Sequence, residues 1–160
     1  MTGLRMDPLA DVPQHTATVM TWIFNQFGAA PGRTLPDVIA GAHRFAHSDR
    51  LPILFVASRD GEPLGCVVLR DHDLPGWDHL TPWLASLFVI PGARGQGIAA
   101  ALARHLEGVA AGLGYARLYL HTPDAVAYYR RLGWTELAQS APDGKATHIL
   151  YKTLALGESA

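Results

Sequence analysis

The sequence predicts an α/β (α+β) fold, built as a single domain over residues 1–160. Apolar positions recur at helical spacing in about four segments, and short apolar runs typical of strands make up about six to seven others. A glycine-spaced turn joins one of these runs directly to an alanine-rich segment in mid-chain. The chain is 49% hydrophobic and 17% charged, which fits a globular domain with an ample core.

The first half of the chain is expected to hold two helices and three or four strands. In the first helix, Val19, Ile23 and Phe27 recur every fourth residue, and the spacing of Asp11 and Gln14 is that of a capping box. The second helix begins with N-cap spacing at Thr34. Two strands flank a hairpin turn at 59–62, and a polar loop, 71–80, precedes the next. The expected elements are a short strand near 4–6, helices 14–27 and 34–47, and strands 53–58, 64–70 and 83–90.

The second half is expected to hold two helices and three strands. The longer helix, 95–113, has one apolar stripe, and Gly114 can close it in the left-handed conformation. A short helix opens at Thr122, with proline in its first position, and stops at Gly133. The expected strands are 117–121, 134–140 and 147–154.

The turn Arg94-Gly-Gln-Gly-Ile-Ala99 predicts a phosphate-binding site. Gly95 and Gly97 leave backbone N–H groups uncovered, and a helix that begins there adds its unpaired N–H groups and the positive end of its dipole. A dinucleotide fold is disfavoured, because its fingerprint normally opens the fold and requires an acidic residue ~20 positions on, where this chain has His121. A Walker loop is excluded, because no Gly-Lys-Ser/Thr follows. A turn that only joins strand to helix remains the structural alternative.

Charge and composition limit the kinds of partner that this chain is expected to bind. The net charge is −1 and no basic run is present, which argues against nucleic acid. No apolar stretch approaches the ~20 residues that span a bilayer, and no signal peptide is visible, so we expect no membrane partner and a cytoplasmic location. The single cysteine, Cys66, is interpreted as a buried thiol. The histidines are scattered without metal-ligand spacing, so no metal is predicted.

Two motifs, taken together, resemble the GNAT (GCN5-related) N-acetyltransferase superfamily. Arg94-x-x-Gly97-x-Ala99 matches its signature Arg/Gln-x-x-Gly-x-Gly/Ala, and Tyr129-Arg-Arg-Leu-Gly-Trp134 matches a tyrosine placed four residues before Gly-Phe/Trp. The order of the expected elements from residue 14 to 154 also agrees. The resemblance implies a mixed central sheet with a V-shaped split between the strands at 83–90 and 116–121.

The resemblance also implies that acetyl-CoA is the cosubstrate and enters that split. The backbone of the turn would bind the pyrophosphate, and the exposed strand edge would pair with the pantetheine amides and polarise the thioester carbonyl. The implied coenzyme contacts are Leu87, Phe88, Val89, Arg94, Gly95, Gln96, Gly97, Ile98, Ala99, Asp124 and Tyr129.

The chemistry implied is direct attack of an amine on the thioester. Tyr129 occupies the position of the family's general acid, and a phenol with a pKa near 10 is protonated at neutral pH and can donate. A core aromatic on a short helix is the structural alternative. Many members carry a strand glutamate as base, but this chain has Ala85 there, and no carboxylate lies in 82–91. Loop 71–80 offers substitutes, of which Asp78 and His79 are the candidate base or substrate contacts.

The sequence therefore predicts an acetyl-CoA-dependent N-acetyltransferase that acts on a primary amine, either of a small molecule or of a peptide N-terminus. Family members usually admit the acceptor between the loop after the first helix, here 27–33, and the last hairpin, here 141–146. A non-catalytic acyl-CoA-binding sensor or partner module is the alternative, and the missing glutamate favours it. The oligomeric state is open, with a homodimer as one candidate.

Overall fold

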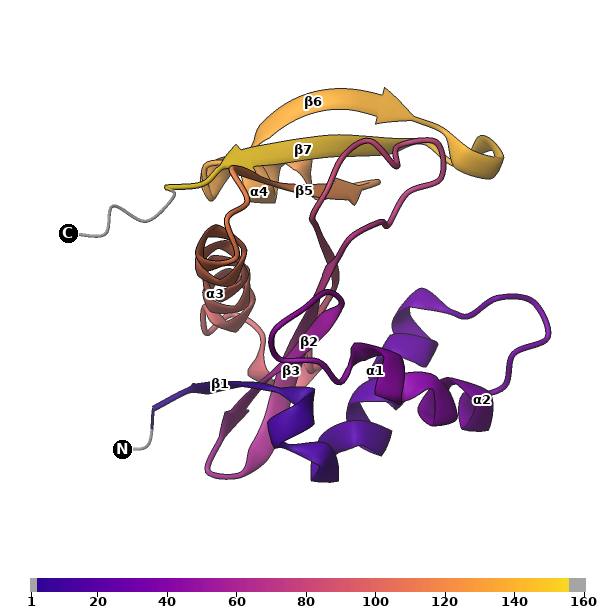
Figure 1. Cartoon of the computed structure of the whole chain (residues 1–160), viewed down its shortest axis with the longest axis vertical. Coiled ribbons are helices and arrows are strands. Elements are labelled where there is room, and N and C mark those ends of the chain that lie inside the picture. Colours follow the sequence, from indigo (N-terminus) through magenta and orange to yellow (C-terminus); the bar gives the residue numbers. More distant parts are fainter. Residues whose placement is uncertain (1–2, 156–160) are drawn as a thin grey trace. The chain divides into compact units, whose positions relative to one another are not determined.

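The computed structural model describes residues 3–155, which form a seven-stranded sheet and four α-helices (Figure 1). The strands are β1 (Arg5–Pro8), β2 (Ile53–Arg59), β3 (Glu62–Arg70), β4 (Trp83–Val89), β5 (Arg117–Thr122), β6 (Thr135–Ser140) and β7 (Thr147–Thr153). The helices are α1 (Thr16–Phe27), α2 (Leu35–Ala40), α3 (Ile98–Gly112) and α4 (Val126–Arg131).

The sheet is mixed, as predicted. Its strands lie in the order β1-β2-β3-β4-β5-β7-β6. The pairs β1/β2, β2/β3, β5/β7 and β6/β7 are antiparallel, whereas β4 and β5 run parallel, with Trp83 opposite Tyr119. This architecture confirms the predicted fold class and the predicted numbers of strands and helices.

The chain divides into two compact units, which are described separately below. The first contains the residues up to Leu69 together with Ser86–His105, and the second contains Arg70–Ala85 and the residues from Leu106 onward. The glycine turn therefore belongs to the first unit, and Tyr129 belongs to the second.

The β2–β3 hairpin forms as the sequence predicts. Asp60 and Gly61 both have positive φ, of 54° and 79°, which is the type I′ pattern that matches the twist of two paired strands. β2 is buried from Ile53 to Ser58, so side chains on both faces of this strand contribute to the core of the first unit.

The two N-terminal helices are shorter than predicted. α1 begins at Thr16, because Pro13–His15 forms a separate 3-10 turn, and the predicted capping box of Asp11 and Gln14 is therefore wrong. The capping box at Thr34 is confirmed: its N–H donates to Asp37 at 2.9 Å, and its hydroxyl accepts from the Asp37 N–H. α2 ends at Ala40 and continues as a 3-10 helix from Gly41, since glycine is a poor helix former.

α3 begins at Ile98, three residues later than predicted. Gly95 and Gly97 have positive φ, of 78° and 79°, which a right-handed helix cannot contain. Its predicted stripe is buried at Ile98, Leu102 and Leu106, but Leu113 lies beyond the helix and is 41% exposed. Gly114, with φ of 95°, closes the helix as predicted.

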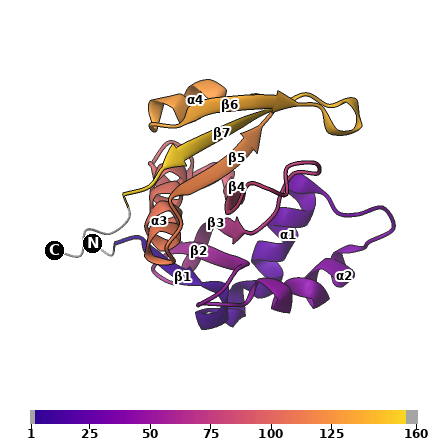
Figure 2. The ribbon, with the colours of Figure 1, turned by 45° about the horizontal axis from the view of Figure 1, so that its top comes forward.

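In the second unit, β5, β7 and β6 lie side by side in that order as antiparallel strands, with α4 packed against β6 (Figure 2). Leu74, Trp83, Tyr119 and Ile149 form a buried cluster on one face of these strands. α4 begins at Val126 rather than at Pro123, because the Thr122 hydroxyl accepts the Ala125 N–H in a local turn. The predicted cap at Thr122 is therefore wrong.

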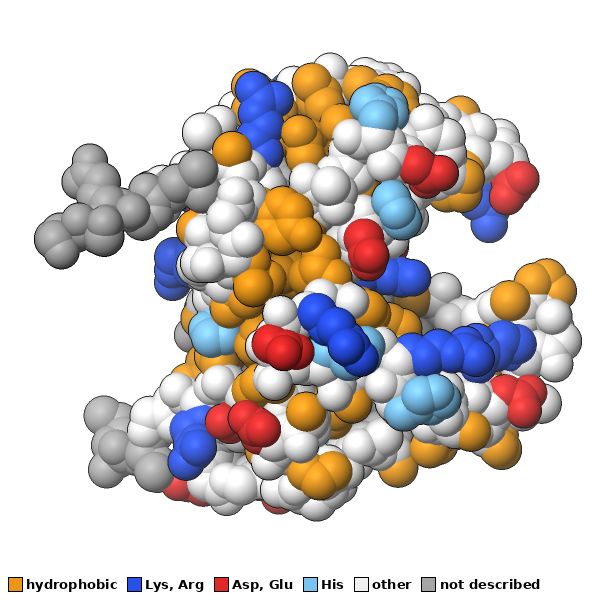
Figure 3. Space-filling view, in the orientation of Figure 1, with side chains coloured by type: hydrophobic (Ala, Val, Ile, Leu, Met, Phe, Trp, Pro, Cys, Tyr) orange, Lys and Arg blue, Asp and Glu red, His pale blue; other side chains and the backbone are white. Residues whose placement is uncertain are grey.

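The surface carries both signs of charge. On the face drawn in Figure 3, acidic and basic side chains are interspersed among apolar ones. Within residues 3–155, no helix is both long enough and apolar enough to cross a bilayer.

Candidate active site

β4 bends at Ser86, one residue after Ala85. Ser86 has φ of 53°, which is uncommon for a residue other than glycine and typical of a strand irregularity. The Cys66 thiol donates to the Ser86 carbonyl at a distance of 3.6 Å. Burial raises the pKa of this thiol to about 12, so it remains protonated and packs as a small apolar group, as predicted. After the bend, Leu87 and Phe88 are partly exposed.

A close approach between strands fixes this part of β4. A Cβ placed on Gly65 of β3 would lie 2.7 Å from the Phe88 carbonyl oxygen and 3.2 Å from the Leu102 side chain. Real side chains do not tolerate that first distance, so only glycine fits without a shift of β4. The Ile90 N–H also donates to the Leu64 carbonyl at 2.9 Å, which anchors the end of the strand.

The glycine turn leads from β4 into the N-terminus of α3. A Cβ at Gly95 or Gly97 would meet no atom within 4 Å among the described residues, so the backbone of the turn faces open space. The first bond of the helix joins the Ala101 N–H to the Gly97 carbonyl at 3.0 Å. The N–H groups of Ile98 to Ala100 precede that bond and have no partner within the helix. This is the geometry of an anion site at a helix N-terminus.

One arginine begins the turn and a second contacts it. Arg94 folds back onto the strand, where its Nε donates to the Val89 carbonyl at 2.9 Å and its guanidinium lies 5.6 Å from the Phe88 ring centre. Arg59 of β2 donates to the Gln96 side chain at 3.2 Å. Sequence patterns do not indicate Arg59, because 37 residues separate it from its partner.

Tyr129 lies on α4 in the second unit. Its ring packs edge-on against those of Tyr128, at a centroid distance of 5.2 Å, and Trp134, at 6.0 Å. Burial, together with the neighbouring Tyr128, raises the pKa of Tyr129 to about 12, so the phenol is protonated over the physiological range.

The other predicted residues of the second unit remain without a demonstrated role. Asp78, His79 and Asp124 are exposed. The His79 ring stacks on Trp77 at a centroid distance of 5.6 Å. Trp83 and Trp134 are buried in the core.

A different histidine in the second unit has an acidic partner. His121 Nε2 lies 3.1 Å from Asp73 Oδ2, and His121 Nδ1 lies 3.1 Å from the Thr147 hydroxyl. Arg70 Nη1 lies 3.6 Å from the other oxygen of Asp73. The sequence offered Asp73 only as part of a polar loop and His121 only as the end of a strand. Their pairing depends on the fold of loop 71–80 over β5.

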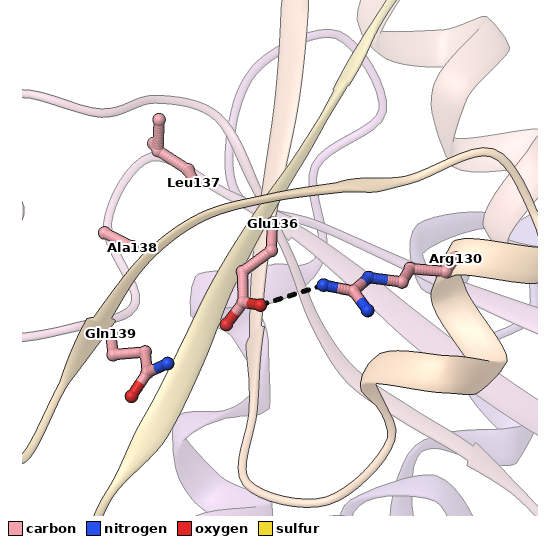
Figure 4. A pocket seen from close by; sticks show the side chains of 5 residues that line it. All are labelled: Arg130, Glu136, Leu137, Ala138 and Gln139. Carbon is pink, nitrogen blue, oxygen red and sulfur yellow. Dashed lines mark hydrogen bonds and ion pairs between the residues drawn. The ribbon is translucent and has the colours of Figure 1, made fainter.

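A second histidine–carboxylate pair lies beside a cavity of about 510 Å³ in the same unit. His148 of β7 is hydrogen-bonded to Glu136 of β6, and Arg130 of α4 reaches the same carboxylate at 3.1 Å (Figure 4). The cavity is lined by Arg130, Glu136, Leu137, Ala138 and Gln139. None of these residues was predicted as a site. Within residues 3–155, no three His, Cys, Asp or Glu side chains gather as a metal site would require.

In this chain a strand ends in a glycine turn at a helix N-terminus, and a parallel strand and a short helix that carries a tyrosine follow. This order of elements defines an acetyltransferase fold. Residues 17–134 match the acetyltransferase (GNAT) family, and the chain belongs to this family. A comparison with curated protein sequences gave no match.

Solved structures share the fold. An aminoglycoside 6'-acetyltransferase type Ii superposes with a TM-score of 0.73 at 17% identity, over 93% of this chain and 96% of that chain. An aminoglycoside 6'-N-acetyltransferase complexed with coenzyme A gives 0.72 at 16% identity, over 93% and 96%. The spermidine/spermine N-acetyltransferase of Vibrio cholerae gives 0.71 at 18% identity, over 94% and 92%.

Proposed function

We propose that this chain is an acetyl-CoA-dependent N-acetyltransferase that transfers an acetyl group to a primary amine by direct attack on the thioester. The observation that carries the proposal is the turn Arg94–Ala99, in which two glycines of positive φ expose backbone N–H groups at the start of α3. Membership of the acetyltransferase family supports the proposal that this anion site binds the pyrophosphate of coenzyme A. Residues 1–160 would act as one N-acetyltransferase domain.

The coenzyme would be held mainly by backbone. The N–H groups from Arg94 to Ala99 would bind the pyrophosphate, and the exposed edge of β4 at Leu87–Val89 would pair with the pantetheine amides. The bend at Ser86 supports this role, because it leaves the following residues partly exposed. Asp124 and Tyr129 stay predicted coenzyme contacts.

Tyr129 would assist departure of the thiolate. The amine nitrogen attacks the carbonyl carbon, the C–S bond breaks, and its electron pair goes to sulfur. The pKa of Tyr129 is about 12, whereas the pKa of a thiol is near 8.5. Full transfer of the Tyr129 proton to the thiolate therefore costs about 5 kcal/mol. A hydrogen bond to the developing charge on sulfur is therefore the main contribution of this side chain.

The acceptor amine is a small molecule or a peptide N-terminus. Two of the similar structures have names that state aminoglycoside and spermidine/spermine acceptors, which makes amines of both kinds good first probes. Asp78 and His79 remain candidate contacts for the acceptor because both are exposed. The homodimer and the cytoplasmic location also stay predictions.

The test is release of free thiol from acetyl-CoA in the presence of kanamycin, spermidine or a peptide with a free N-terminus. Turnover with at least one amine, reduced at least tenfold in Tyr129→Phe while coenzyme A still binds, is the expected result. Tight coenzyme binding without turnover on any amine would favour the sensor module instead. Equal turnover by Tyr129→Phe would remove Tyr129 from the mechanism.

A further inference from the structure

The strand glutamate common in the family is missing here, so the proton of the attacking amine needs another acceptor. Ala85 occupies its position and is only 5% exposed. Among the described residues of the second unit, His121 lies on the neighbouring strand and is bonded to a carboxylate. This inference rests on the proposed function, because it concerns the same reaction.

The register of the sheet places His121 on the same face as Ala85. Trp83 of β4 and Tyr119 of β5 are opposite each other in the parallel pair, and the Trp83 ring lies 5.8 Å from the ring of Tyr119 and 6.0 Å from that of His121. Side chains alternate between the two faces along a strand. Two residues further on, Ala85 and His121 therefore follow on the face that Trp83 and Tyr119 share.

The hydrogen bonds around His121 assign its tautomer. Asp73 carries a carboxylate, which only accepts, so the ring proton belongs on Nε2 at 3.1 Å from Asp73. Nδ1 then holds a lone pair and accepts from the Thr147 hydroxyl, also at 3.1 Å. The carboxylate would stabilise the imidazolium that forms when Nδ1 takes up a proton. Arg70 Nη1 lies 3.6 Å from the other oxygen of Asp73.

On this face His121 is partly open to solvent. The His121 side chain is 27% exposed, whereas Asp73 behind it is 17% exposed. Thr147 begins β7 directly after the loop 141–146 and is itself 5% exposed. His121 thus has a basic nitrogen, Nδ1, that accepts the Thr147 hydroxyl, with its charge partner on the other ring nitrogen.

We propose that His121 accepts the proton of the attacking amine, through the Thr147 hydroxyl, with Asp73 as its positioning residue. As the nitrogen bonds to the carbonyl carbon, its proton passes to Thr147 Oγ and the hydroxyl proton passes to His121 Nδ1. The C–S bond then breaks, and the thiolate leaves. The imidazolium returns its proton to solvent or to the thiolate, so the site ends as it began.

In the alternative, a structural clamp, the hydrogen bonds of His121 only hold loop 71–80 against β5 and β7 and take no part in the reaction. The second pair, His148 and Glu136, provides a matched control, because it also joins a histidine to a carboxylate but comes from residues of the opposite strand face. The variants are His121→Gln, His121→Ala and Asp73→Asn, with His148→Gln as the control. Folding of each is checked by thermal unfolding.

The measurements are kcat, KM for acetyl-CoA and the pH profile, with whichever amine of kanamycin, spermidine or a free-N-terminal peptide the wild type acetylates. For His121→Gln we expect kcat at neutral pH to fall by about 100-fold or more, as for loss of a general base, with KM for acetyl-CoA unchanged. The loss should shrink at high pH, where the amine itself is deprotonated. Added imidazole should restore part of the activity of His121→Ala, and Asp73→Asn should lose about tenfold.

The outcomes separate the two proposals. If the wild type acetylates an amine and His121→Gln keeps its rate, or loses no more than His148→Gln, the base assignment is wrong and the proposed function stands. A rate loss that tracks unfolding, without rescue by imidazole, supports the clamp and overturns the assignment. If the wild type acetylates none of the amines, the proposed function fails and the base assignment fails with it.

Discussion

The Trp134 N–H donates to the Tyr129 carbonyl at 3.0 Å, across the C-terminus of α4. The Gly133 N–H donates to the Arg130 carbonyl, also at 3.0 Å, and Gly133 has φ of 95°. These two bonds make a Schellman motif, and the edge-on contact of the Tyr129 and Trp134 rings is its usual apolar companion. The spacing Tyr-x-x-x-Gly-Trp therefore ends helix α4 in a Schellman motif and holds the Tyr129 side chain in position.

Gly133→Ala should therefore affect both stability and turnover. Alanine at this φ costs roughly 1–2 kcal/mol, and its Cβ would lie 3.3 Å from Lys152, which donates to the Leu132 carbonyl. We expect the free energy of unfolding to fall by about that amount or more, and kcat to fall because Tyr129 shifts. Urea unfolding and thiol release measure the two effects.

Gly114→Ala is the matched control for that variant. Gly114 has the same φ of 95° at the end of α3, but its Cβ would meet nothing within 4 Å. It should lose a similar amount of stability from the backbone alone and keep its turnover. Equal kcat losses in the two variants would contradict the assigned link between Gly133 and Tyr129.

Gly65→Ala should weaken coenzyme binding because it displaces β4. The added Cβ would sit 2.7 Å from the Phe88 carbonyl, so β4 must move, at a cost of about 1–3 kcal/mol typical of overpacking. The edge at Leu87–Val89 moves with it, and we expect lower affinity for coenzyme A by isothermal titration calorimetry.

Gly108→Ala serves as the comparison, because it adds the same methyl group to an exposed position of α3 with open space around it. It should stabilise the protein by up to about 1 kcal/mol, since alanine is the better helix former, with unchanged coenzyme affinity. If Gly65→Ala binds coenzyme A as the wild type does, β4 is not held as described.

Acidification should destabilise the protein through His105. Burial lowers the pKa of His105, opposed in part by Asp7, and its buried Nε2 has no hydrogen-bond partner among the described residues. Below the unfolded-state pKa near 6.5 the unfolded chain takes up the proton first, so stability falls as the pH drops from there toward the lower folded value. Urea unfolding at several pH values should show this slope, and His105→Gln should flatten it. An unchanged slope in the variant would assign the effect to other groups.

Much of the fold follows from local signals in the sequence. Asp60-Gly61 determines the hairpin turn, Thr34 and Asp37 form their capping box, and the apolar runs locate the strands to within a few residues. The glycine turn and the Tyr129–Trp134 spacing are local as well. Each of these features is determined by residues that are close together in the chain.

The sequence-based predictions that differ from the structure do so for physical reasons. The start of α3 was placed too early because helical periodicity does not reveal that Gly95 and Gly97 adopt positive φ. The start of α4 was misplaced because the Thr122 hydroxyl caps a turn rather than the helix. The Asp73–His121 pair joins residues 48 positions apart, and only the folded loop brings them together.

The most direct test of the central claim is the affinity of coenzyme A for Gly97→Val, measured by isothermal titration calorimetry. A valine at this position of positive φ would cover the N–H groups at the start of α3. Gly108→Val, on the exposed side of the same helix, controls for the substitution itself, and thermal unfolding confirms that both variants are folded. The account predicts that the wild type and Gly108→Val bind coenzyme A and that Gly97→Val does not. Equal affinity in all three proteins, or no binding to the wild type, would contradict it.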